Sequence, residues 1–293
     1  MAAGNYTAVI TAQGAALRRL QHCGRDLVVP FAAGGPIPDY RGIIAAPWPN
    51  RIADGSYRSD GTVLHLPINE IARNTALHGL VFDRTWTFQE FDGAAVTLGC
   101  ELEPTHGYPF SLALQVRYSL DDGGLHTEVT AGNTGGRTAP YGVCPHPYLV
   151  AGSSPLDEWV LELAAETFLA VTPDRLLPVA RVPVQGHPFD FRTPRALGAV
   201  EIDHAFTDLR FAPTGRAELL LHDPVGTGVG MSWDTSCPWL QVHTADKPAP
   251  QRSRLGLAVE PMTCPPDAFN SGTDLVLLAP GARHHAGWSI FAR

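Results

Sequence analysis

The segment from Ser111 to Ala131 constrains the fold more than any other part of the chain. Its first half, Ser111–Leu120, and its second half, Leu125–Ala131, both alternate apolar and polar residues with a period of two. This alternation is typical of a β-strand that buries one face. Between the halves, Asp122-Gly123-Gly124 tolerates the positive φ angles that a tight turn needs. The segment therefore predicts an antiparallel hairpin.

Similar short runs occur along the whole chain, separated by Gly, Pro, Asp and Asn. They are Tyr6–Thr11, Thr62–Leu66, Trp86–Phe91, Ala95–Leu102, Trp159–Leu163, Ala217–His222, Gly228–Trp233, Leu240–Thr244, Leu255–Val259, Leu275–Leu278 and Gly287–Phe291. No long stretch has the 3.6-residue period of an amphipathic helix. The pattern predicts an all-β sandwich or barrel with few short helices.

The length of the chain leaves the number of domains open. Its 293 residues suggest about two domains, yet large β-sandwiches reach this size as one. No composition shift, linker or internal repeat divides the sequence. The residues alone leave one or two domains open.

Charge and composition exclude several partners. The net charge is −8, and no run of Lys or Arg is longer than Arg18-Arg19, so we expect no nucleic-acid partner. No apolar stretch approaches about 18 residues, and the first residues lack a signal-peptide pattern, so we expect no membrane partner. Five scattered cysteines without a CxxC pair indicate mainly reduced core thiols. Together these features predict a cytoplasmic protein.

The chain has 20 arginines but a single lysine, Lys247. Lys247 lies in a polar, Pro-rich run that we expect to be an exposed loop. Schiff-base and P-loop chemistry both need a positioned lysine, so we expect neither. The sequence also lacks HExxH, HxH and GxSxG patterns. Known metalloprotease and nucleophile-elbow chemistry is therefore not indicated.

Five segments concentrate polar residues among Gly, Pro and aromatic residues, as functional loops on a rigid scaffold do. They are residues 47–57, 74–86, 144–150, 201–207 and 257–272. Within them, His146 lies between two prolines that hold its backbone rigidly. Glu260 follows an apolar run, where burying a carboxylate is costly without a partner or a purpose. Taken singly, each residue is also compatible with a structural role such as a turn cap or an ion pair.

Taken together, these segments resemble the aldose 1-epimerase (galactose mutarotase) family, in its bacterial branch. The order and spacing of the motifs agree from about residue 40 to the C-terminus. The matching residues are Asn50-Arg51-Ile52 with Gly55; Leu77-His78-Gly79 with Phe82, Asp83 and Trp86; His146-Pro147-Tyr148; Asp203-His204 with Phe206; Gln241; and Glu260 with Pro266-Asp267-Ala268 and Asn270.

The resemblance implies a large antiparallel β-sandwich, the galactose mutarotase-like supersandwich, with one sugar-binding cleft and a single domain over residues 1–293. It implies an enzyme of carbohydrate metabolism that interconverts the α and β anomers of a free aldohexose. The partner would be a small sugar, with no metal or organic cofactor, and the protein would be a monomer or homodimer.

Anomer interconversion passes through the open-chain aldehyde, which calls for one acid and one base at the anomeric centre. By the resemblance, His146 is the general acid for the ring oxygen and Glu260 the general base for the C1 hydroxyl. Reference pKa values of ~6.5 and ~4.3 allow a protonated imidazole beside an ionised carboxylate near neutral pH, and a nearby carboxylate would favour the imidazolium further.

The resemblance also suggests which residues bind the sugar. We expect a stacking face from Trp48 or Trp239. The residues expected to hold the sugar hydroxyls are Asn50, Arg51, His78, Asp203 and Gln241.

Departures from the family pattern leave the sugar open. Leu80 follows Gly79, and Leu149 follows Tyr148, where typical members carry Gly and Phe. The leading candidate is a neutral hexose such as glucose or galactose. Arg73 or Arg84 would suit a sulfosugar or a hexose 6-phosphate, because Arg recognises oxyanions bidentately.

Two further alternatives remain. A non-catalytic carbohydrate-binding sandwich would be expected to lack His146 or Glu260. A glycosidase would use Asp203 and Glu260 as its carboxylate pair.

Overall fold

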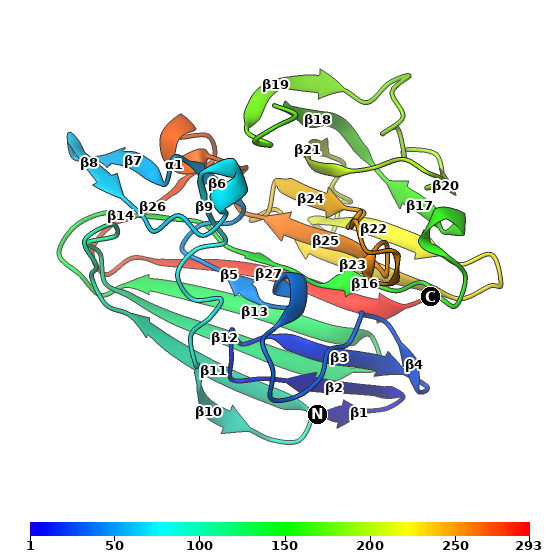
Figure 1. Cartoon of the computed structure of the whole chain (residues 1–293). Coiled ribbons are helices and arrows are strands. Elements are labelled where there is room, and N and C mark those ends of the chain that lie inside the picture. The colour runs from blue at the N-terminus through cyan, green and yellow to red at the C-terminus, as the bar shows by residue number, and fades with distance from the viewer.

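Two antiparallel sheets dominate the computed structural model, which describes all 293 residues (Figure 1). The nine-stranded sheet has the order β10 (Thr87–Phe91), β11 (Ala95–Leu102), β12 (Leu112–Asp121), β13 (Gly124–Asn133), β27 (Arg283–Ala292), β23 (Gly228–Asp234), β22 (Arg216–His222), β17 (Val160–Leu163) and β20 (Arg195–Ala196). The six-stranded sheet has the order β16 (Tyr148–Leu149), β25 (Leu257–Met262), β24 (Trp239–His243), β21 (Asp203–Leu209), β18 (Ala165–Val171) and β19 (Pro178–Pro183). The predicted all-β class is confirmed.

Smaller elements surround these sheets. A four-stranded sheet contains β1 (Ala2–Ala3), β2 (Tyr6–Ile10), β3 (Leu17–His22) and β4 (Arg25–Asp26). Two-stranded pairs join β14 (Ala139–Tyr141) to β26 (Val276–Leu278), β15 (Cys144–Pro145) to β5 (Ile44–Ala45), β6 (Arg51–Ala53) to β9 (Thr75–Leu77), and β7 (Ser56–Ser59) to β8 (Thr62–His65).

Helical structure is confined to five short pieces. They are α1 (Ala268–Ser271) and the 3₁₀ turns η1 (Pro38–Tyr40), η2 (Ile71–Arg73), η3 (Leu156–Glu158) and η4 (Pro250–Arg252). None has the length and apolar character needed to cross a membrane. In Figure 1, β6, β7, β8, β9 and α1 gather on one side of the molecule, across from β18, β19 and β21.

The predicted hairpin is confirmed as β12 and β13, which pair from Leu112–Asn133 to Asp121–Gly124. Burial alternates along β12 as the sequence pattern requires, with Leu114 and Val116 in the core and Gln115 exposed between them. The strands β3, β18, β19 and β21 were not predicted. In β21, Ala205, Phe206 and Thr207 are consecutive and all buried, so this strand lacks the alternation of a half-buried strand.

The core lies between the two large sheets. One cluster of 63 buried residues includes Leu114 and Val116 from β12, Val242 from β24 and Val259 from β25. Burying each such side chain contributes about 1.5–3 kcal/mol. Side chains alternate across a strand. Gln241, next to Val242, and Glu260, next to Val259, therefore point to the other face of the six-stranded sheet.

All five cysteines are free. Cys100, Cys144, Cys237 and Cys264 are buried, which agrees with core thiols, whereas Cys23 is exposed at a turn. Cys23 has a left-handed backbone, with φ of 49°.

Candidate active site

Three neighbouring strands present polar side chains on the face of the six-stranded sheet that points away from the core. In β24 and β25, Gln241 lies directly opposite Glu260. In β21, Asp203 lies opposite His243, two residues from Gln241 along β24, and Gln241 Nε2 donates a hydrogen bond of 2.6 Å to Asp203 Oδ1. Leu240 and Val242 point into the core on the opposite face. The period of two therefore separates scaffold residues from site residues along the same strand.

His146 is held over this face by the short connection between β15 and β16. Its backbone N–H donates to Ile43 O at 3.1 Å, and its carbonyl accepts from Gly42 N at 2.7 Å. The carbonyl of Pro147 accepts from Val259 N in β25. His146 Nε2 lies 3.3 Å from Glu260 Oε1, and both side chains are almost completely buried. The backbone therefore fixes the imidazole beside the carboxylate.

Burial shifts the pKa values of this pair in opposite directions. It lowers the pKa of His146 to about 3, with the positive charge of His243 acting the same way. Burial raises the pKa of Glu260, and the charge of Asp203 adds to this, while Arg51 and the Cys144 thiol oppose it. The predicted imidazolium beside an ionised carboxylate is therefore wrong for this structure. A neutral pair, with the proton on Glu260, is favoured because neither charge is hydrated.

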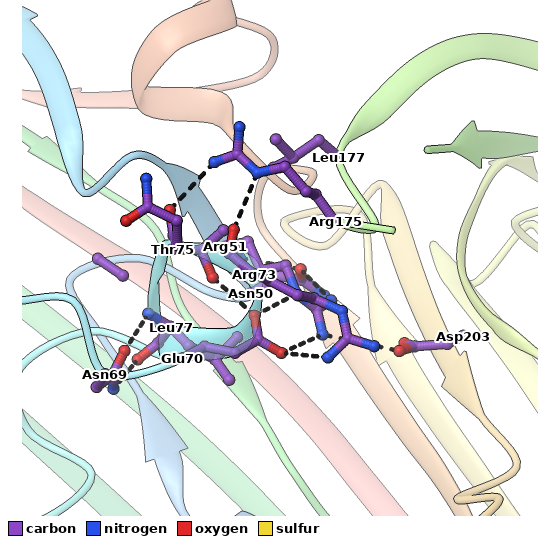
Figure 2. Close-up of polar contacts among 12 residues, drawn as sticks. Asn50, Arg51, Asn69, Glu70, Arg73, Thr75, Leu77, Arg175, Leu177 and Asp203 are labelled. Atoms are coloured by element: carbon purple, nitrogen blue, oxygen red, sulfur yellow. Dashed lines mark hydrogen bonds and ion pairs between the residues drawn. The ribbon is translucent and has the colours of Figure 1, made fainter. Parts of the chain in front are cut away.

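Arg51 is the centre of a buried polar network at one side of the cleft (Figure 2). Its Nε and Nη2 donate to the two oxygens of Glu70, at 2.8 and 3.1 Å. Arg73 Nη1 and Thr75 Oγ1 also donate to Glu70. Although burial alone would raise the pKa of Glu70, the Arg51 hydrogen bonds and charge lower it. Arg51 Nη2 then lies 3.8 Å from Asp203 Oδ2, which aims the guanidinium at the floor of the cleft.

Asn50 and His78 reach the same cleft from two adjacent left-handed turns, with φ of 52° and 60°. His78 N donates to Asn50 O at 2.9 Å, and Arg51 Nη1 donates to Asn50 Oδ1 at 3.3 Å. The next residue, Gly79, has φ of 79°, and a Cβ there would lie 2.0 Å from Ala46 O. Glycine is therefore required for the chain to pass so close and present the His78 ring.

The motif around Asp267 supports Arg51 from behind. Asp267 Oδ1 accepts from Ala53 N at 2.9 Å, and Asp267 N donates to Arg51 O at 2.7 Å. The start of α1 therefore pins β6, so this part of the sequence motif is structural.

All seven predicted site residues line one cleft of about 250 Å³. They are Asn50, Arg51, His78, His146, Asp203, Gln241 and Glu260. Residues dispersed over more than 200 positions thus meet in a hollow of the right scale for a monosaccharide.

The prediction that Trp48 or Trp239 offers a stacking face to the sugar is wrong. Trp48 and Trp239 are buried outside the cleft, and their indole N–H groups donate to Ala76 O and Asp274 Oδ2. The aromatic face in the cleft comes from Tyr40, whose ring centre lies 4.8 Å from that of His78. A tyrosine in a Gly- and Pro-rich loop carries no periodic signal, so the sequence did not reveal it.

The prediction that Lys247 lies in an exposed loop, unpositioned, is also wrong. Lys247 lines the cleft, and its Nζ lies 3.5 Å from Asp39 Oδ1. Of the two candidate anion-binding arginines, Arg73 lines the cleft. Arg84 does not; it donates instead to Leu80 O and borders a separate hollow.

Seven further lining residues were not predicted as site residues, although Leu77 and Tyr148 belong to the matched motifs: Asp39, Tyr40, Glu70, Leu77, Tyr148, His243 and Asp246. Glu70 had an indirect signal, since a buried Arg51 needs a carboxylate partner. His243 had another, because it follows Gln241 by two residues on the same strand and so shares its face.

A larger hollow of about 610 Å³ lies on the other side of Asp39 and Tyr40. Its walls are mainly apolar and include Phe31, Ile43 and Phe82. It contains no acid and base in contact, so we assign the chemistry to the smaller cleft.

Comparison with known proteins bears on this geometry. The family model described as aldose 1-epimerase matches residues 1–290. The chain belongs to the aldose 1-epimerase family. The uncharacterised protein YihR of Escherichia coli (strain K12) is 38% identical over all of the chain and 92% of its own length. The galactose mutarotase of Homo sapiens is 33% identical over 54% of the chain, an alignment that spans 47% of that protein.

Solved structures agree with this epimerase family fold. The GalM/aldose epimerase homologue from C. elegans has a TM-score of 0.88 and 22% identity, covering all of this chain and 97% of the other. The galactose mutarotase-like sandwich that the sequence predicted is therefore confirmed.

Proposed function

We propose that this member of the aldose 1-epimerase family interconverts the α and β anomers of a free aldohexose. The observation that carries the proposal is the buried contact of 3.3 Å between His146 Nε2 and Glu260 Oε1 in a cleft of monosaccharide size. The ring oxygen and the C1 hydroxyl of an aldose are bonded to the same carbon. Two adjacent proton-transfer groups can therefore each contact one of them.

In the proposed reaction, Glu260 removes the proton of the C1 hydroxyl while His146 protonates the ring oxygen. The bond between C1 and the ring oxygen breaks, and the C1 oxygen becomes a carbonyl. Rotation about the C1–C2 bond exposes the other face of the aldehyde. His146 then takes back the proton from the C5 hydroxyl, Glu260 returns its proton to the carbonyl oxygen, and the ring closes as the other anomer.

The pKa shifts of His146 and Glu260 fit the proton transfers of the proposed reaction. The pair carries one proton at every stage: on His146 before ring opening, on Glu260 while the sugar is in its open-chain form, and on His146 again after ring closure. Burial, which lowers the pKa of His146 and raises that of Glu260, favours the second state, in which the proton lies on Glu260. The open-chain sugar is therefore bound by a neutral pair. In the empty cleft the proton also lies on Glu260, so it must pass to His146 across the 3.3 Å contact before a cyclic sugar can open.

Other groups are suited to hold the sugar hydroxyls. Asp203 is an acceptor, because the charges of His243 and Arg51 and the Gln241 hydrogen bond lower its pKa although burial alone would raise it. Gln241 Oε1 is buried without a hydrogen-bond partner in the protein, so it is available to a hydroxyl. Arg51, His78 and Asn50 complete the proposed set.

A second candidate, a mutarotase for an anionic sugar, is favoured by two cations in the wall of the cleft. Lys247 and Arg73 are about one-third exposed, and each faces one carboxylate, Asp39 or Glu70. A sulfonate or phosphate carried on C6 would compete with Asp39 for Lys247.

The test is anomer exchange followed by NMR on α-D-glucose, α-D-galactose, glucose 6-phosphate and a 6-sulfonated glucose. The proposal predicts exchange of at least one neutral hexose well above the buffer rate. Acceleration restricted to the charged sugars, and lost in Lys247→Gln, would favour the second candidate. No acceleration with any sugar, while the protein still binds them, would indicate a non-catalytic sugar-binding sandwich.

A further inference from the structure

His78, His146 and Glu260 form a compact group of potential metal ligands inside the cleft. One ring nitrogen of each histidine and one carboxylate oxygen lie within 4.8 Å of one another, and all three side chains are buried. Two histidines and one glutamate are a ligand set that binds zinc with an open fourth position. The open position here would face the cleft.

The spacing of the group suits a small tetrahedral ion. Zinc bonds of about 2.0–2.2 Å in a tetrahedron place neighbouring ligand atoms about 3.3–3.6 Å apart. His146 Nε2 and Glu260 Oε1 are 3.3 Å apart, long for a charge-assisted hydrogen bond but the separation that one shared ion needs. No two of these ligand atoms are more than 4.8 Å apart, so shifts of about 1 Å would bring the group to tetrahedral spacing.

The charged side chains around the three ligand residues give a weak preference for a cation. Five carboxylate side chains line the cleft against three Lys or Arg side chains. Of those three cations, Arg51 is already neutralised by its two hydrogen bonds to Glu70. Asp39 and Asp246 also pair with Arg41, Arg252 and Arg254, so the excess of carboxylates attracts a divalent ion only weakly.

The outer contacts are incomplete. Cys144 Sγ donates to Glu260 Oε2 at 3.8 Å, but the Nδ1 atoms of His78 and His146 have no partner. Ligand histidines that lack such support bind about 10–100-fold more weakly. Reversible binding is therefore expected rather than a resident metal.

We propose that His78, His146 and Glu260 form a reversible binding site for Zn²⁺ and similar late transition-metal ions. The ion would act as an inhibitor and not as a cofactor, because it would occupy the lone pairs that proton transfer uses. Bound metal and a sugar positioned for ring opening would exclude one another at these atoms.

The test is titration of tag-free full-length protein with Co²⁺, whose visible absorption reports four-coordinate binding, followed by displacement with Zn²⁺. Three proteins are compared: wild type, His78→Gln, and the control His243→Gln, which changes another cleft histidine outside the group. We expect one Co²⁺ per chain, displaced by Zn²⁺. His78→Gln should weaken binding about tenfold or more, and His243→Gln should not.

Absence of saturable binding in the wild type would overturn the proposal. So would equal weakening in the two variants, or an affinity unchanged by His78→Gln. Folding of each variant is checked by thermal melting without metal. Because cobalt binding needs no catalysis, a protein that binds metal without mutarotating any sugar would contradict only the proposed function. A mutarotase that binds no Co²⁺ would contradict only the metal site.

Discussion

The two large sheets use the same alternation of side chains but differ in what covers their second faces. In β12 of the nine-stranded sheet, buried residues alternate with half-buried or exposed ones. In β25 of the six-stranded sheet, all six residues are buried. Loops carrying His146, His78 and Arg51 cover the outer face of β25, so Glu260 is buried where the corresponding positions of β12 meet water.

This difference explains where polar chemistry can be placed. A carboxylate on the outer face of β12 would be hydrated and ordinary. On β25 the same group loses its water, its pKa rises, and its interactions strengthen. When loops cover the second face of a sheet, polar side chains on that face lose their water, and the strand that carries them can form an active site.

Leu240 and Gln241 are neighbours on β24 that point to opposite faces of the sheet, so their variants separate effects on stability from effects on the cleft. Leu240 is fully buried in the core, so Leu240→Ala should reduce the free energy of unfolding by about 2–5 kcal/mol. The KM of the folded protein should not change. Urea unfolding and steady-state kinetics measure the two quantities, and a large KM change would show that the two faces are not independent.

Gln241→Ala tests the opposite face of the same strand. It removes the donor to Asp203 and a free acceptor in the cleft. A hydrogen bond to a charged group contributes about 1.5–3 kcal/mol, so kcat/KM should fall about 10–100-fold. Stability should change far less than in Leu240→Ala. Equal kinetics in the variant and the wild type would contradict the role assigned to Gln241.

The pH dependence of stability tests the burial of His146. Because its pKa falls to about 3, the unfolded chain binds a proton between pH 6.5 and 3 that the folded protein does not. The contribution of His146 to stability is then fully present above pH 6.5 and is lost as pH falls, by up to about 1.4 kcal/mol per pH unit. The raised pKa of Glu260 acts in the opposite direction, so the His146 contribution is read as the difference between wild type and a His146 variant.

His146→Asn should remove this contribution, so wild type should lose more stability than the variant as pH falls, while His78, whose pKa burial also lowers, should leave part of the acid sensitivity in both. Urea midpoints at pH 7.5 and 5.5 give the comparison. Parallel pH profiles for the variant and the wild type would mean that His146 is hydrated.

The smallest expected effect concerns the thiol beneath Glu260. Cys144→Ala removes the sulfur contact to Glu260 Oε2, and a hydrogen bond of about 0.5–1.5 kcal/mol predicts a two- to tenfold loss of kcat/KM. Cys237→Ala, another fully buried thiol without this contact, is the matched control and should keep its activity. Equal losses in both variants would assign the effect to packing alone.

The sequence predicted those parts of the molecule in which one physical signal dominates. The β12–β13 hairpin has alternation and turn residues, so its position follows from the sequence to within one or two residues. The motif residues His146, Glu260, Asp203 and Arg51 were found through resemblance, and their convergence needed the fold.

Tyr40, Lys247 and Glu70 could not be predicted, because their places depend on how loops cross the outer face of the six-stranded sheet. The charge states of His146 and Glu260 were wrong for the same reason. Reference pKa values assume water, and the covering loops exclude it.

His146 and Glu260 are proposed to act together as one acid–base pair. The direct measurement is polarimetry of freshly dissolved α-D-galactose and α-D-glucose with wild type, His146→Asn, Glu260→Gln and the double variant. Because neither group can complete ring opening alone, each single variant should lose about 10²–10⁴-fold in kcat/KM, and the double variant should lose little more. Wild-type acceleration that survives in either single variant, or losses that multiply in the double variant, would contradict the pair.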